Sequence, residues 1–219
     1  MNTIVSALLL AVVGLQGSRG ASFNCNQPAH SGENIYPYTI PDIMDAKNIS
    51  LSNYGGRVVL VVNVFRGQRI PSLLTLVFDC FQQEPGNNGT EILNGVKYVR
   101  PGGGFVPNFQ MFTKIEVNGA NEHPLYTYLK KYCPQTTNTF EADLLHYAPI
   151  RVGDVLWNYE IFLANRQGVV MKRYSSDTNP LDLKSDIENM LKMKAAPSRK
   201  LEKKRRLQQI RTENRIPLN

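Results

Sequence analysis

The stretch Val58–Val64, VVLVVNV, constrains the fold more than any other part of the chain. Six of its seven residues are Val or Leu, and polar residues do not alternate with them. Such a run is typical of a strand buried on both faces, usually at the centre of a parallel sheet. Functional residues of open α/β sheets gather beyond the carboxyl ends of such strands. The next residues, Phe65–Arg69, include no Cys, Ser, His or carboxylate, so this position has no nucleophile.

Charge is distributed unevenly along the chain. Its 219 residues carry a net charge of +7, and 42% hydrophobic with 20% charged residues indicates one globular domain with room for extra segments. Residues 192–219 contain ten Lys or Arg and two Glu, whereas the remainder is close to neutral. We expect residues 195–219 to be a basic C-terminal tail, either solvated or in contact with a heparin-like polyanion.

The N-terminus has the pattern of a secretory signal. Ile4–Leu15 is apolar but too short to span a bilayer, and Ser18–Gly20 offers small residues at a cleavage site. We therefore expect residues 1–20 to be a signal peptide, the mature protein to be secreted and extracellular, and no transmembrane segment. In a secreted chain, the sequons at Asn48 and Asn88 are candidate glycosylation sites.

The cysteines and histidines predict no metal centre. Three cysteines are an odd number, so at least one thiol is free or pairs with another chain. There is no CxxC motif, and the three histidines are scattered. We expect no metal and no bound cofactor.

Three parts of the chain follow strand, loop and hairpin patterns. Leu73–Phe78 is a second apolar run and predicts a strand. Pro101–Gly104 must be a loop, because three successive glycines disfavour a helix or a central strand. Tyr159–Ala164 and Val169–Tyr174 flank a turn sequence, Asn165–Gly168, and predict a hairpin.

Two helices are expected further along the chain. Leu125–Tyr132 has apolar residues at helical spacing, between Pro124 and Pro134. Asn179-Pro180 is suited to open another helix. That helix is expected to bury the apolar residues Leu183, Ile187, Met190 and Leu191.

Several motifs together resemble one known family. They are Lys97–Phe109 (KYVRPGGGFVPNF), Val117–Gly119 (VNG), Trp157–Glu160 (WNYE) and Arg173-Tyr174. Over residues 36–194 the chain resembles the glutathione peroxidases, closest to their secreted animal members. The resemblance implies an α/β thioredoxin-like fold with a central mixed sheet. It also implies reduction of hydroperoxides by glutathione in oxidative-stress defence, and it makes a homotetramer plausible.

The family's site needs a selenocysteine or cysteine after the core strand, at the start of a helix, with a Gln, a Trp and an Asn around it. By resemblance, Trp157 and Asn158 are the matching Trp and Asn, although a core aromatic and a strand-end polar residue are the plain alternatives. Gln82 or Gln83 is a weaker stand-in for the Gln, but neither lies in the family's motif, because the segment beginning at Cys80 is three residues short. Cys80 itself is expected to be a small buried hydrophobe. The peroxidatic residue has no counterpart.

Two arginines resemble family residues that bind the carboxylates of glutathione. Arg173 is one, and Arg100 is a weaker match; arginine suits this bidentate task. The alternative is a surface salt bridge or a subunit contact.

The connection after the core strand is too short for the family's active-site helix. A parallel crossover needs a dozen or more residues, but only the eight residues Phe65–Ser72 separate Val64 from Leu73. We therefore expect the domain, residues 21–194, to be incomplete between 65 and 80, the active-site helix to be absent, and one sheet face to be bare.

Three hypotheses remain open at this point. The sequence is an incomplete translation of a selenoenzyme gene, or a catalytically dead family member that acts by subunit association, or a polyanion-binding secreted module. A UGA codon in the genomic segment between Val64 and Leu73 distinguishes the first hypothesis.

Overall fold

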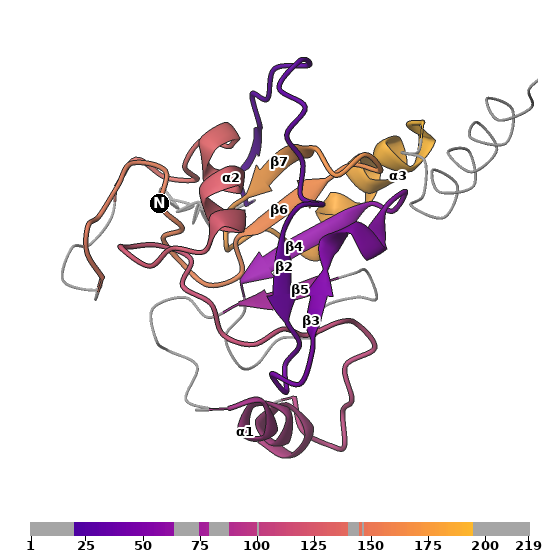
Figure 1. Cartoon of the computed structure of the whole chain (residues 1–219), viewed down its shortest axis with the longest axis vertical. Helices are drawn as coiled ribbons and strands as arrows, with labels where there is room; N and C mark the ends of the chain where they lie inside the picture. The colour runs from indigo at the N-terminus through magenta and orange to yellow at the C-terminus, as the bar shows by residue number, and fades with distance from the viewer. Residues whose placement is uncertain are drawn as a thin grey trace, which may run out of the picture.

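The computed structural model describes residues 20–63, 88–99, 101–139, 145 and 147–194, together with the backbone of 75–78. Within these residues, one mixed sheet has the strand order β1–β7–β6–β4–β5 (Figure 1). Only the β4–β5 pair is parallel among its four described pairings. The strands are β1 Ser22–Asn24, β4 Val59–Asn63, β5 Thr75–Phe78, β6 Ile161–Ala164 and β7 Val170–Tyr174.

The core strand predicted from VVLVVNV is confirmed as β4, whose five residues are all buried. Because side chains alternate across a strand, Val59 and Val61 enter the core cluster on one face, while Leu60 and Val62 enter the cluster on the other. Its two neighbours differ in direction, since β5 is parallel and β6 antiparallel. The strand is therefore central to a mixed sheet.

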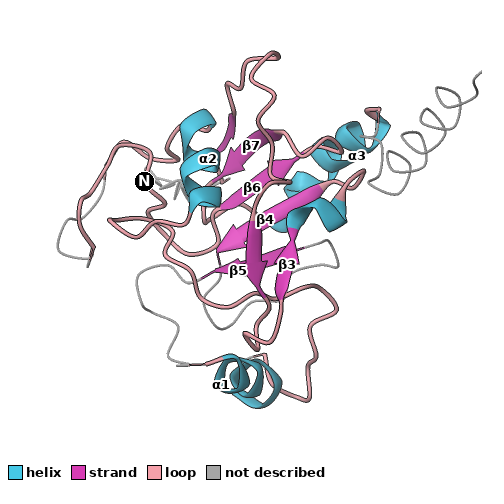
Figure 2. Ribbon diagram, in the orientation of Figure 1, coloured by secondary structure: helices cyan, strands magenta, loops and turns pink. Residues whose placement is uncertain are grey.

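Helix α2, Pro124–Tyr132, covers the first face of the sheet (Figure 2). It buries Leu125 and Leu129 against β4 and β6, as its apolar spacing predicts. The His123 imidazole caps the helix by accepting a hydrogen bond from the backbone N–H of Leu125 at 3.2 Å. Burial lowers the pKa of His123 below 6.5, which favours the neutral ring that this cap requires.

The second face is covered by the 3₁₀ turn η4, Pro180–Leu183, and helix α3, Lys184–Lys192. Asn179 caps this segment as predicted, and Leu183 and Met190 are buried against the sheet. The prediction for Leu191 is wrong, because its side chain is 52% exposed. Leu191 directly follows Met190, and a helix turns by about 100° per residue, which carries it off the buried stripe.

The expectation of a bare sheet face is also wrong for β4. On the α3 face, Leu60 and Val62 are 5% and 1% exposed. A crossover helix is not the only possible cover for the sheet, because α3 packs on this face with Leu183 and Met190. The connection after β4, residues 64–74, lies outside the described residues. The absence of its helix therefore stays a prediction.

The predicted hairpin is confirmed as β6 and β7. Asn165 makes the turn, since its Oδ1 accepts hydrogen bonds from the N–H groups of Gln167 and Val169 at 2.9 and 3.1 Å. Gly168 completes it with a φ of +78°. A Cβ at this position would lie 2.9 Å from the ring of Tyr36, so the turn requires glycine for both reasons.

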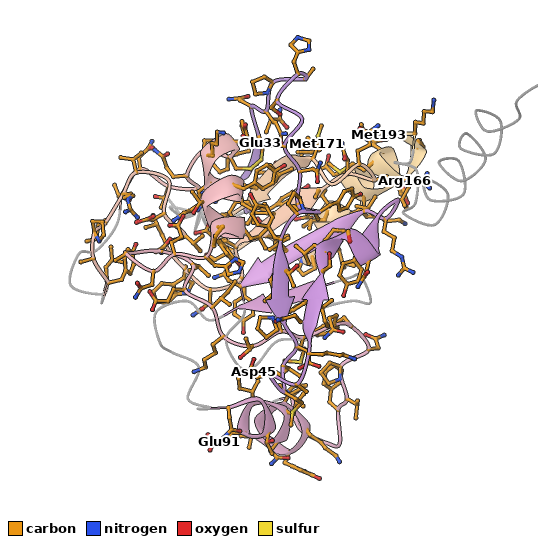
Figure 3. All side chains as sticks on the ribbon, in the orientation of Figure 1. Glu33, Asp45, Glu91, Arg166, Met171 and Met193 are labelled. Atoms are coloured by element: carbon orange, nitrogen blue, oxygen red, sulfur yellow. A yellow bond between two sulfur atoms is a disulfide. The ribbon has the colours of Figure 1, made fainter. Side chains whose placement is uncertain are left out.

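The remaining elements are β2 Thr39–Pro41, β3 Asn48–Ser50, the 3₁₀ turn η1 Leu51–Tyr54, α1 Gly89–Asn94 and the π-helical turn η2 Gly95–Val99. Helix α1 lies at the lower end of the molecule in Figure 1. Gly89 packs so closely that a Cβ there would overlap the carbonyl oxygen of Ile43, and Figure 3 shows Asp45 and Glu91 at this same end. Both sequon residues, Asn48 and Asn88, are exposed.

A disulfide joins Cys25 to Cys133 across 108 residues of sequence. It ties the segment after β1 to the end of α2. With three cysteines in the chain, this pair leaves Cys80 as the odd one, and Cys80 lies outside the described residues. The signal segment up to residue 19 and the tail 195–219 lie outside them as well.

Candidate functional site

The candidate site is formed where the loop before β6 meets the carboxyl end of β4. The Asn63 side-chain Nδ2 donates a hydrogen bond to the carbonyl of Trp157 at 2.9 Å. The backbone N–H of Tyr159 donates to the carbonyl of Asn63 at 2.6 Å. These bonds place Trp157 and Asn158 directly at the end of the core strand, which is the position that the sequence motif predicts for a functional pair.

The two residues differ in exposure. Asn158 is 3% exposed, whereas Trp157 is 45% exposed, so Trp157 is not a core aromatic. An indole N–H and an amide NH₂ are the two side-chain donors that this pair can offer to an anion. Both groups are donors of the kind that can bind an anion.

Tyr159 turns the chain sharply between this pair and β6. Its φ is +68°, a left-handed conformation that costs a residue with a side chain about 1–2 kcal/mol. Such a conformation persists only where surrounding contacts over-determine it. The contacts of Asn63 on one side and Glu160 on the other are those that hold the turn.

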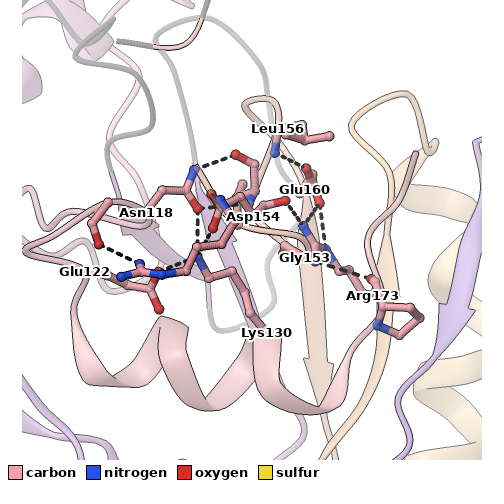
Figure 4. A network of polar contacts seen from close by, with 12 residues as sticks. Asn118, Glu122, Lys130, Gly153, Asp154, Leu156, Glu160 and Arg173 are labelled. Carbon is pink, nitrogen blue, oxygen red and sulfur yellow. Dashed lines mark hydrogen bonds and ion pairs between the residues drawn. The ribbon is translucent and has the colours of Figure 1, made fainter. Parts of the chain in front are cut away.

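Glu160 contacts the backbone of the loop that carries Trp157. One carboxylate oxygen, Oε1, accepts hydrogen bonds from the N–H of Leu156 at 2.7 Å and of Trp157 at 3.4 Å. The other oxygen, Oε2, accepts from the Arg173 Nε at 2.7 Å (Figure 4). The side chains of Glu160 and Arg173 are 1% and 0% exposed, so this ion pair is fully buried.

Arg173 is occupied by protein acceptors. Besides Glu160, it donates to the carbonyls of Gly153 at 2.8 Å, Asp154 at 2.9 Å and Pro134 at 3.3 Å. Its guanidinium also lies 5.0 Å from the ring centroid of Phe162. A buried arginine with its donors used in this way has no face for a soluble carboxylate. Arg173 thus forms a buried salt bridge with Glu160. Its position does not support the expected contact with glutathione.

A second buried network anchors the start of the same loop on α2. The Lys130 Nζ contacts the carboxylates of Glu122 and Asp154, the latter at 2.7 Å, and the Asn118 Oδ1 at 2.9 Å. Asn118 in turn exchanges two hydrogen bonds with the backbone of Val155, at 2.7 and 3.0 Å. The loop that carries the candidate site is therefore fixed to α2 at one end and to β7 at the other.

Sequence reasoning missed Glu160, Lys130 and Asp154 as parts of this site. A signal was present, since Glu160 and Arg173 stand in the two arms of a predicted apolar hairpin. Charges buried in such arms require opposite partners. The other predicted residues, Gln82 and Arg100, lie outside the described residues.

Two observations concern what the site could hold. In the part of the chain that the structure describes, no group of His, Cys, Asp or Glu residues is arranged to bind a metal. The Asn63 Oδ1 is buried and has no hydrogen-bond partner among the described residues.

Comparison with known proteins gives consistent matches. Residues 66–130 match the family model described as "Glutathione peroxidase". Glutathione peroxidase 3 of Pongo pygmaeus is 40% identical over 182 positions, covering 74% of this chain and 80% of the relative. Glutathione peroxidase 3 of Bos taurus is 37% identical over 200 positions (82% and 87%). The epididymal secretory glutathione peroxidase of Sus scrofa is 40% identical over 178 positions (72% and 81%).

The alignment with the Pongo pygmaeus relative also has a length difference. It extends over 182 positions but uses 74% of this 219-residue chain, which is about 162 residues. About 20 of the 182 aligned positions therefore have no residue in this chain.

Solved structures agree on the fold. The apo crystal structure of Trgpx has a TM-score of 0.51 and 26% identity, covering 75% of this chain and 99% of that one. The crystal structure of T. cruzi GPX1 has a TM-score of 0.50 and 22% identity, covering 73% of this chain and 97% of that one. At this identity it supports the fold alone. The expected thioredoxin-like α/β fold class is confirmed.

Proposed function

Because the chain belongs to the glutathione peroxidase family, we propose that its site is built for reducing hydroperoxides with glutathione, and that the sequence as written lacks the peroxidatic residue. The observation that carries this proposal is the position of Trp157 and Asn158 at the carboxyl end of β4, set by two hydrogen bonds to Asn63. This is where a nucleophile following the core strand would need its donors.

The chemistry assigns a distinct task to each group. A selenol or thiol anion supplies the electron pair that attacks a peroxide oxygen, releasing an alcohol, and glutathione then reduces the oxidised group. Trp157 and Asn158 would donate hydrogen bonds that favour the anionic form of the nucleophile. Neither can replace it, because an indole and an amide have no electron pair of comparable nucleophilicity. Gln82 as a third donor and Arg100 as a glutathione contact remain part of the proposal.

We further propose that the sequence is an incomplete translation around a selenocysteine codon. Three observations support this: the absence of a thiol or selenol in Phe65–Ser72, the roughly 20 unmatched positions in the alignment, and the buried acceptor of Asn63 that lacks a described donor. Sequencing the genomic segment between the codons of Val64 and Leu73 tests the idea. A UGA codon in a longer open frame is expected, and an uninterrupted frame without one would contradict it.

Activity gives the second test. The chain as written should show only background turnover in a coupled glutathione assay with hydrogen peroxide. Cys80→Ser is the control, because Cys80 is the one cysteine outside the disulfide. Turnover that disappears in this variant would show that Cys80 serves as the nucleophile.

A second candidate function is favoured by the charge of the tail. A catalytically inactive chain could act through association with other subunits, as in a homotetramer, or through polyanion binding by residues 195–219. Salt-sensitive retention on heparin that is lost on deleting the tail would support the polyanion role. Retention that survives the deletion would exclude the tail as its cause.

We also propose that the mature protein is a secreted glycoprotein without its first twenty or so residues. The Cys25–Cys133 disulfide is typical of oxidising compartments, and both sequon asparagines are exposed. None of the described helices has the length and hydropathy that a bilayer span requires. N-terminal sequencing of protein from culture medium tests the cleavage. Asn48→Gln and Asn88→Gln should each lower the mass of the secreted protein by that of one glycan.

A further inference from the structure

We propose that Glu160 is the positioning residue of the candidate site. Its carboxylate, locked in place by Arg173, holds the backbone that presents Trp157 and Asn158 at the end of β4. The inference rests on the proposed function only for the task of those two side chains. The positioning itself concerns the geometry of the chain as it exists.

The hydrogen-bond chemistry requires a carboxylate at this position. The described partners of Glu160 are all donors: the N–H groups of Leu156 and Trp157 on one oxygen, and the guanidinium of Arg173 on the other. A glutamine has one acceptor oxygen and one donor NH₂ group. In Glu160→Gln, the NH₂ group must therefore face a donor, so either the loop or Arg173 loses its acceptor.

The contacts are arranged so that a change at Glu160 reaches the site. Arg173 also binds the carbonyls of Gly153 and Asp154, so the ion pair holds the loop both before and at Trp157. From the other side, Asn63 binds the backbone of Trp157 and Tyr159. The left-handed turn at Tyr159 lies between these two attachments, and releasing the Glu160 attachment allows it to relax.

The chain contains a spectroscopic reporter at the site itself. Trp157 is its single tryptophan, so intrinsic fluorescence reads the environment of that one residue. At 45% exposure, full release of the indole would raise its accessibility to a neutral quencher about twofold, the ratio of full to 45% exposure. A residue that served overall stability alone would not change the quenching of the folded protein.

The test compares Glu160→Gln with Asp186→Asn, under conditions where circular dichroism shows both to be folded. Asp186 is the control, since it is a partly buried carboxylate paired with Lys172 that has no described contact with residues 153–160. Acrylamide quenching of Trp157 should rise by up to about twofold in Glu160→Gln and stay at the wild-type value in Asp186→Asn. Unchanged quenching in Glu160→Gln, or an equal rise in both variants, would overturn the proposal.

If Glu160→Gln does not fold, a measurement on the unaltered chain tests whether Glu160 holds the backbone of this loop. The Leu156 amide lies outside any regular strand, and its described acceptor is Glu160. Hydrogen exchange followed by NMR should show this amide protected at least tenfold relative to an unstructured peptide, and an unprotected amide would overturn the proposal. Neither readout depends on peroxidase activity, so failure of the proposed function and failure of this inference are distinguishable.

Discussion

Replacing Arg173 by Met removes the positive charge from the buried pair while keeping an unbranched apolar side chain. Glu160 is then left buried without its counter-ion, since its side chain is 1% exposed. Breaking a buried pair in this way costs about 3–5 kcal/mol, because the remaining charge is neither solvated nor paired. The three carbonyls that Arg173 binds lose a donor as well, so the lower figure is a minimum.

This loss is large compared with the stability of a typical domain, about 5–15 kcal/mol. Urea unfolding followed by circular dichroism and by Trp157 fluorescence measures it. With a slope of about 1–3 kcal/mol per molar urea, the midpoint should fall by about 1 M or more. The double variant with Glu160→Met should recover part of the loss, since an apolar pair leaves no buried charge.

Lys184→Met is the matched control. It removes a cation from an ion pair with Glu188 whose side chains are 78% and 55% exposed and whose charged atoms are 4.0 Å apart. An exposed pair of this kind contributes at most about 0.5 kcal/mol. The reasoning fails if Arg173→Met costs less than about 1 kcal/mol, or if the double variant is destabilised by the sum of both single changes.

Three further predictions concern the turn, the core and the cap. Gly168→Ala should destabilise the chain by more than Gly32→Ala. Both glycines have positive φ, but only a Cβ at residue 168 would meet an aromatic ring, at 2.9 Å. Urea midpoints measure both losses, and equal losses would contradict this prediction. Leu129→Ala should cost about 2–5 kcal/mol, since Leu129 is fully buried, while Leu191→Ala should stay within about 0.5 kcal/mol in the same assay. Burial lowers the pKa of His123, so its contribution to the free energy of unfolding should be complete above about pH 6.5 and fall as the pH drops toward the lowered pKa. His123→Asn keeps a capping side chain but removes this pH dependence. Identical pH profiles of stability for the two proteins would refute the prediction.

The parts of the fold that sequence could predict are those decided by local pattern. The burial of β4 follows from its composition, α2 from the spacing of its apolar residues, and the hairpin from the turn residues at Asn165–Gly168. Trp157 and Asn158 were assigned by resemblance to the family's motif, and in the structure that motif immediately precedes β6, which pairs with β4.

The parts that sequence could not predict depend on contacts between distant segments. Arg173 was expected to bind a ligand. Its place in a predicted apolar arm indicates a buried charge that needs a partner. Local sequence does not reveal that the partners are Glu160 and the carbonyls of three other residues. The sheet face was expected to be bare, because chain length does not show that α3 folds back over β4. Burial of a charge and cover of a face are both properties of the assembled fold.

The Cys25–Cys133 disulfide has a topological consequence. It closes a covalent ring that contains β2 to α2, including the whole stretch between β4 and α1. A protease that cuts once anywhere within this ring opens it without releasing a fragment. The cut protein therefore runs as one species without reductant and as two with it. When the cut falls between β4 and Cys133, the N-terminal piece contains β4 and stays attached to the piece with the hairpin β6–β7 that completes the sheet.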